Sequence, residues 1–135
     1  MRDSFDLLNK VFDLSIIDNE LMLLLGSPST LDEQNNKLRR EIQTADVIEE
    51  ADVPFVSFYF DGSTKSKVNY MANKGDLYFD IYAGSIYVIS QIAKAIRKLL
   101  RSNMEIAFMY EGQQPSGVNG VYKYRLIYNP IIDGI

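Results

Sequence analysis

Cysteine, histidine and tryptophan are all absent from this sequence of 135 residues. Without cysteine, the chain can form neither a disulfide nor a thiolate metal site. Without histidine, it lacks the commonest metal ligand, the usual general base and the side chain that titrates near neutral pH. These absences exclude zinc chemistry and any Ser-His or Cys-His nucleophile. We therefore expect no metal site and no enzyme that depends on histidine or cysteine.

Positive charge and long apolar runs are also scarce. Lysine and arginine total 14 against 18 aspartate and glutamate residues, which gives a net charge of -4. Binding to the phosphates of nucleic acid requires a basic surface, and this chain is acidic overall. We therefore expect no sequence-specific nucleic acid binding. No apolar run reaches the ~18 residues of a membrane span, and residues 1–19 lack the pattern of a signal peptide. We expect a soluble protein that is not exported and does not bind membranes.

The segment 84–101 has the strongest pattern in the chain, because its apolar residues recur at steps of three and four. The apolar side carries Ile86, Ile89, Ile92, Ala93, Ile96, Leu99 and Leu100. The other side carries Ser90, Gln91, Lys94, Arg97, Lys98 and Arg101. This pattern predicts an amphipathic helix whose apolar face packs on a sheet.

Two further helical regions are predicted in the N-terminal third. Residues 4–25 have helical spacing that is interrupted near Ile17, with Ser4 and Asp18 as N-caps and Gly26 ending the segment. A helix pair and a bent helix fit this pattern equally well. Leu38 and Ile42 are four residues apart, which allows a short helix within 31–43.

Strand patterns fill most of the remaining chain, and turn residues separate them. We predict strands at 55–60, 77–82, 104–110 and 121–128, an exposed strand at 65–71, turns at 61–63 and 73–76, and an irregular loop at 111–120. In the segment 77–82, Leu77, Phe79 and Ile81 should face the helix, while Tyr78, Asp80 and Tyr82 lie on a wetter face. The apolar tail Ile131, Ile132 and Ile135 should dock on its own domain or meet a partner.

These elements predict one α+β domain over residues 1–135. We expect an antiparallel sheet of four or five strands, packed by the central helix 84–101 and an N-terminal helix. A polar, acidic segment at about 27–53 should connect the N-terminal helices to the first strand.

Charge is concentrated in two places. Residues 31–52 contain seven acidic and three basic residues, so their balance of -7 + 3 = -4 equals that of the whole chain. This segment is either a solvated loop or a surface for a charged partner. The basic residues of the central helix have three possible explanations. They form a solvated face, they contact nucleic acid, or they contact the acidic segment of a neighbouring subunit. The candidate interface residues are Lys94, Arg97, Lys98, Arg101, Glu41, Glu49 and Glu50.

The order of these elements along the chain is similar to that of a known protein family. A Pro-led strand VPFVSFYF is followed by LYFDIYAGSIYVISQIAKAIRKLL, a Gly-rich loop and the closing strand GVYKYRLIYN. This arrangement, over about residues 18–129, resembles the small tail-completion (tail-terminator) and head-to-tail joining proteins of long-tailed bacteriophages. The likeness lies in the order and spacing of elements, and the acidic segment is longer than in that family.

The resemblance implies an α+β subunit that forms a ring, often hexameric, between the tail tube and the capsid connector. It implies self-association, contacts with tail-tube and connector proteins, no reaction and no cofactor. The chain would be found in the virion, and in the host cytoplasm during assembly. The loops 64–73 and 113–119 are candidates for docking these partners, through Lys67, Tyr70, Met71, Gln113, Gln114, Ser116 and Asn119.

Two other classes of function stay open. A small ligand-binding or regulatory α+β domain would need a closed apolar pocket. A cofactor-free enzyme could use tyrosine, lysine and carboxylate groups, but these residues form no convergent motif in the sequence. The nine tyrosines suit protein interfaces, and they suit ordinary strands equally well.

Overall fold

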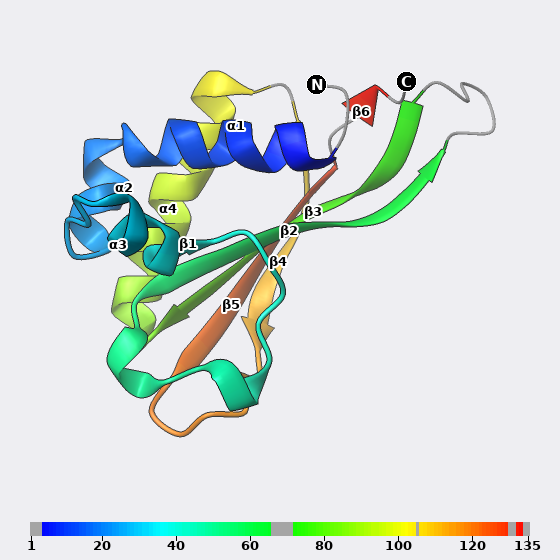
Figure 1. Cartoon of the computed structure of the whole chain (residues 1–135). Helices are drawn as coiled ribbons and strands as arrows, with labels where there is room; N and C mark the ends of the chain where they lie inside the picture. Colours follow the sequence, from blue (N-terminus) through cyan, green and yellow to red (C-terminus); the bar gives the residue numbers. More distant parts are fainter. Residues whose placement is uncertain (1–3, 66–71, 105, 130–131, 134–135) are drawn as a thin grey trace.

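A computed structural model describes residues 4–65, 72–104, 106–129 and 132–133, and it has helices packed on one face of a sheet (Figure 1). The strands follow the order β1-β2-β3-β5-β4, and β6 pairs with β3 beside this path. Their bounds are β1 Leu38–Arg39, β2 Phe55–Lys65, β3 Ala72–Ala83, β4 Ala107–Gln114, β5 Tyr122–Asn129 and β6 Ile132–Asp133. The short β1 pairs with β2 in parallel, and the other pairs are antiparallel. The predicted α+β class is confirmed, although the sheet is mixed.

The described residues form four α-helices beside the sheet. They are α1 (Ser4–Ile16), α2 (Asn19–Leu24), α3 (Leu31–Lys37) and α4 (Ile86–Asn103), and two short 3₁₀ turns, η1 (Ala45–Val47) and η2 (Glu50–Asp52), precede β2. The central helix begins where the Ser85 side chain accepts a hydrogen bond from the Val88 N–H at 3.2 Å. It continues to Asn103, so Met104 caps its end and does not begin a strand. Its apolar face is buried as predicted from Ile89 to Leu100, whereas Ile86 in the first turn is 49% exposed.

The predicted N-terminal interruption is a break between two helices. The Asp18 carboxylate accepts a hydrogen bond from the Leu21 N–H at 2.9 Å and so starts α2. Gly26 ends this region with a φ of +88°, a backbone conformation that glycine adopts without strain. The Ser27 N–H then donates to the Met22 carbonyl at 2.8 Å, which closes the helix end.

Both predicted turns around the tip of the first hairpin are wrong. Residues 61–63 lie within β2 and residues 73–76 lie within β3. A register shift between Asp61 and Thr64 absorbs the turn-forming residues without ending the strand. At Gly75 a Cβ would lie 2.5 Å from the Asp61 carbonyl oxygen, so this glycine permits close strand approach. Residues 66–71, where most of the predicted exposed strand falls, lie outside the described residues.

Two other boundaries differ from the prediction because strand pairing outweighs local composition. Residues 111–114 belong to β4, where they pair with residues 123–126 of β5, and the loop begins only at Pro115. The helix predicted within 31–43 ends at Lys37. Leu38 instead enters β1 and is buried against β2, while Ile42 is exposed.

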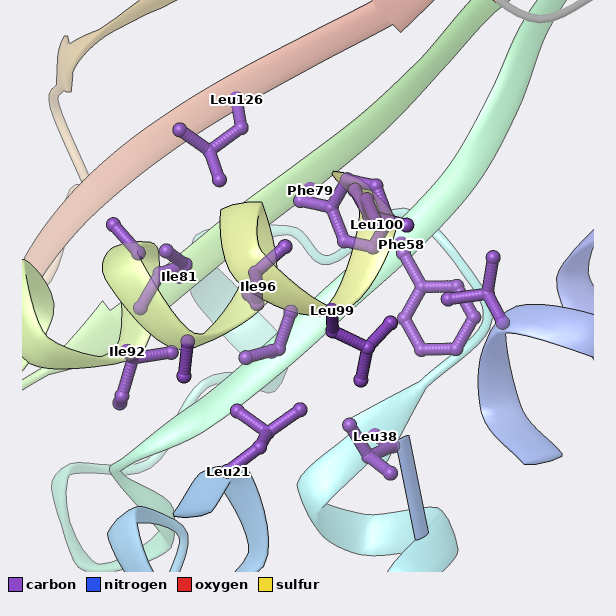
Figure 2. Packing of buried hydrophobic residues seen from close by; sticks show 14 of the residues in the cluster. Leu21, Leu38, Phe58, Phe79, Ile81, Ile92, Ile96, Leu99, Leu100 and Leu126 are labelled. Atoms are coloured by element: carbon purple, nitrogen blue, oxygen red, sulfur yellow. The ribbon is translucent and has the colours of Figure 1, made fainter. Parts of the chain in front are cut away.

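The main core lies between the helices and one face of the sheet (Figure 2). Leu77, Phe79 and Ile81 face α4, as predicted, and Leu126 of β5 joins them. In the tail, Ile132 pairs with Asn73 of β3, whereas Ile131 and Ile135 lie outside the described residues.

A second, smaller cluster lies on the opposite face of the sheet, at the end where β2 begins. Phe55 and Tyr82 stack there with ring centroids 4.7 Å apart. The segment 45–53 and the loop 115–121 cover this pair and contribute Ile48 and Val121. The prediction of a wetter face is therefore wrong for Tyr82 and Asp80, which are each 1% exposed.

Candidate interaction surface

A groove runs between α4 and the edge strand β4. The helix packs on β3 and β5, and none of the described helices packs broadly on β4. Two hollows result, of about 490 and 270 Å³. Arg97 lines both of them, so they form one surface that we call the α4–β4 groove. The larger hollow is lined by Arg97, Arg101, Met104, Ile106, Phe108 and Tyr128.

The groove has an apolar floor and a cationic rim. Phe108 is 50% exposed, and its ring meets Tyr128 edge-on at 5.5 Å. Burial raises the pKa of Tyr128, so this hydroxyl stays neutral. Arg97 forms an ion pair with Glu111 of β4 across the middle of the groove. Arg101 is exposed and forms no ion pair with any described residue.

The predicted basic side of the helix is therefore divided between two directions. Arg97 and Arg101 line the groove. Lys98 points toward α2, where its Nζ lies 3.8 Å from a Glu20 carboxylate oxygen. Lys94 is exposed and lines neither hollow.

The acidic segment starts next to β1 and then crosses the face of the sheet opposite the helices, where it meets the loop 115–121. Glu41 and Ile42 line a polar hollow of about 530 Å³ together with Val47. Ile42 and Val47 are 65% and 54% exposed, which is unusual for aliphatic side chains in an acidic segment. We call Glu41, Ile42, Asp46 and Val47 the acidic edge.

Most carboxylates of the segment 41–52 have no ion-pair partner among the described residues. The exception is Asp52, which lies 3.4 Å from the guanidinium of Arg39. The Thr44 hydroxyl hydrogen-bonds to the Asp46 carboxylate and lowers the pKa of Asp46, so this group stays ionised. Glu49 is exposed, and Glu50 lies beside Gly120 of the loop 115–121. The structure does not bring Glu41, Glu49 or Glu50 into an ion pair with the basic residues of α4 in the same chain.

The residues predicted to lie in docking loops are found in a strand, in a loop and outside the described residues. Gln113 and Gln114 belong to β4. Ser116 holds the loop together, because its hydroxyl accepts from the Val118 N–H at 3.0 Å and donates to the Val121 carbonyl at 2.7 Å. Asn119 is exposed at the tip. Lys67, Tyr70 and Met71 lie outside the described residues.

The sequence analysis missed a buried ionic cluster on the face of the sheet opposite the helices. The Asp80 carboxylate accepts hydrogen bonds from the Arg125 Nε at 2.8 Å and from the Tyr59 hydroxyl at 2.9 Å. Lys123 Nζ lies 3.7 Å from the same carboxylate. Burial, reinforced by the Asp80 charge, raises the pKa of Tyr59 well above its usual range, and the hydrogen bond to Asp80 raises that of Arg125.

This cluster joins three strands and is satisfied by its own members. Asp80 is on β3, Tyr59 on β2, and Arg125 and Lys123 on β5. Because the carboxylate oxygens already have partners, the geometry indicates a role in holding the sheet together and not in acid-base chemistry. The signal in the sequence was the alternation of Lys123 and Arg125 in the last strand and a single acidic residue within 77–82.

The part of the chain that the structure describes contains no candidate metal cluster and no helix that could span a membrane. Its acidic residues form no group of three or more placed to hold a metal ion. Its helices are all too short or too polar to cross a membrane.

Comparisons with known proteins identify the fold. No family model and no curated protein matches this sequence. Among solved structures, the fold is similar to that of a chain in the virion of a native gene transfer agent particle. The two share a TM-score of 0.62 and 10% sequence identity, and the match covers 92% of each chain.

Proposed function

We propose that this chain is a structural subunit of a virion. The observation that carries the proposal is the fold, which is shared over 92% of both chains with a component of a gene transfer agent virion. The resemblance in element order to phage tail-completion and head-to-tail joining proteins points the same way and rests on different evidence.

Within the virion, we place the chain in a ring, with six copies as the expected number, between the tail tube and the capsid connector. The ring would end the tail tube, join it to the connector, or do both. Two features support self-assembly of this kind: a groove beside β4 that no described element covers, and an acidic edge whose carboxylates form no ion pair with the described residues. A closed ring requires two different surfaces of this kind on each subunit.

A non-enzymatic role agrees with the ionic cluster, because Asp80 is fully engaged by Arg125 and Tyr59. The alternative of a ligand-binding domain would require a closed apolar pocket. The cavity in the main core between Leu21 and Phe58 has a volume of about 10 Å³. This volume is close to the lower limit for a single water molecule, so the cavity has no room for a metabolite.

The test is to delete the gene for this chain and examine the particles by electron microscopy and mass spectrometry. We expect the chain in purified wild-type particles. We expect the deletion to yield filled or empty heads separated from tails, or tails of abnormal length, with recovery when the gene is supplied in trans. Absence of the chain from purified particles, or normal joined particles without it, would contradict the proposal.

A further inference from the structure

We infer that the α4–β4 groove of one subunit receives the acidic edge of a second copy of this chain. The inference rests on the proposed self-assembly and names the two surfaces that make the contact. Its main anchors are Ile42 and Val47 on the acidic edge and Phe108 in the groove. Arg101 provides the matching charge.

The first support is the exposure of apolar residues along β4. Phe108, Met109 and Tyr110 are consecutive and are 50%, 56% and 45% exposed, and of these three residues Phe108 lines the groove. They lie on an edge strand, whose outer backbone groups face no described strand. Exposed apolar residues in a row on an edge strand favour association with another chain. Among the described elements the helix layer stops at α4, so the groove has space for an element of another chain.

The second support is complementary charge. The segment 41–52 has five acidic residues and no lysine or arginine. Of these five, only Asp52 has an ion-pair partner among the described residues. The groove offers the opposite sign through Arg101, which is likewise unpaired among the described residues. Unlike charges that are unpaired within each subunit favour and orient a specific contact between subunits.

The third support is the placement of the two surfaces. The groove lies on the helix face of the sheet, between α4 and β4. The acidic segment starts beside β1 and covers the opposite face as far as the loop 115–121. The two surfaces of one chain therefore lie on opposite sides of the sheet and do not meet each other. A head-to-tail contact between different copies uses both surfaces of every subunit, and it forms a ring when the rotation between neighbouring copies closes.

The absence of cysteine provides a direct test. Val47→Cys and Phe108→Cys variants are prepared separately, mixed in equal amounts and oxidised, and the disulfide-linked peptides are quantified by mass spectrometry. Random collision gives about twice as many mixed links as links of either like kind, by simple counting. We expect the 47–108 link to exceed that ratio at least about five-fold. Lys10→Cys, at an exposed position of α1, replaces Val47→Cys as the matched control and should give no excess.

Charge reversal supplies an independent measurement. Arg101→Glu should raise the dissociation constant of self-association, measured by sedimentation, by about ten-fold or more. Glu41→Lys with Asp46→Lys should do the same, and a chain carrying all three changes should recover much of the loss. Lys98→Glu is the matched control, because it reverses a charge on the same helix outside the groove.

The outcomes separate this inference from the proposed function. A chain that is found in particles but gives no excess 47–108 link, or that responds equally to Arg101→Glu and Lys98→Glu, overturns the inference and leaves the proposed function in place. An excess of the 47–108 link in a chain that is absent from particles supports the inference and overturns the proposed function. A chain that stays monomeric at all concentrations and forms no link also overturns the inference.

Discussion

The two faces of the sheet are covered in different ways. On the helix face, α1, α2 and α4 bury a continuous apolar core around Phe58 and Phe79. On the opposite face, two connecting segments cover only a small cluster at one end, and the centre is occupied by the ion pair of Asp80 and Arg125. Neither face of β3 is therefore solvent-exposed at its centre, although the sequence predicted that one of them would be.

Different interactions stabilise the two faces: apolar packing on the helix face and charge pairing on the opposite face. Shortening an apolar side chain on the helix face should lower the free energy of unfolding in proportion to the volume removed, because apolar contacts are non-directional. The opposite face depends on partners of the correct charge and geometry, because a buried carboxylate without them is costly. Substitutions on the two faces should therefore differ in how well a conservative replacement is tolerated.

The largest effect should come from the helix face. Phe58 is 1% exposed and stacks on Phe79 with ring centroids 5.8 Å apart. Phe58→Ala should lower the free energy of unfolding by about 3–5 kcal/mol, measured by urea denaturation, because it leaves a cavity. Phe58→Leu should cost roughly 1.5 kcal/mol or less, since most of the volume remains. Equal losses for both variants would contradict this account of the core.

The next effect tests the ionic cluster. Arg125→Met keeps much of the side-chain length but leaves Asp80 with Lys123 at 3.7 Å and the Tyr59 hydroxyl at 2.9 Å. We expect a loss of about 2–4 kcal/mol, below the full cost of an unpaired buried charge because these partners remain. Adding Asp80→Asn should recover part of the loss. If the double variant is less stable than Arg125→Met alone, the buried charge is not the cause.

A smaller effect with a pH signature should come from Tyr59. Tyr59→Phe removes the hydrogen bond to Asp80 and should cost about 1 kcal/mol at pH 7. Burial raises the pKa of Tyr59 in the folded protein above the value of about 10 in the unfolded chain. Its stabilising contribution is therefore complete below about pH 10 and is lost as the pH rises further.

The measurement is urea denaturation of wild-type and Tyr59→Phe proteins between pH 7 and 11. The variant should lose less stability than the wild type above pH 10. Tyr122→Phe, at a tyrosine that is 43% exposed, is the control. Parallel pH curves for wild-type and Tyr59→Phe proteins would show that this hydroxyl does not contribute to the alkaline loss.

The smallest effect should come from the surface ion pair of Lys98 and Glu20. Their side chains are 74% and 58% exposed. Lys98→Ala should change the free energy of unfolding by roughly 0.5 kcal/mol or less, because exposed ion pairs are screened by water and salt. A change above about 1 kcal/mol would mean that the contact between α2 and α4 depends on charge and not on its apolar residues.

Much of the fold was predictable because it rests on local patterns. The helix at 86–103 follows from apolar spacing, and the break before α2 follows from Asp18. The strand containing Leu77, Phe79 and Ile81 follows from alternation. In each case the neighbours that determine the structure lie within a few residues.

The candidate surface was predictable only in part. The basic residues of α4 were identified from their spacing, but Arg97 turned out to be paired with Glu111 and Lys98 to face Glu20. Phe108 was not singled out, because its exposure depends on β4 lying beyond the helix layer. Which charges remain unpaired depends on contacts between segments that are far apart in the sequence.

The sequence by itself determined the amphipathic helix, the Asp18 cap of α2, the α+β class and the exclusion of histidine and cysteine chemistry, because composition and short-range periodicity are sufficient for these. The tertiary structure alone decided that Gly75 lies within a strand, that residues 111–114 pair in β4 and that Asp80 is buried with Arg125. The physical reason is that strand register and the pairing of buried charges depend on partner strands, which local sequence does not specify.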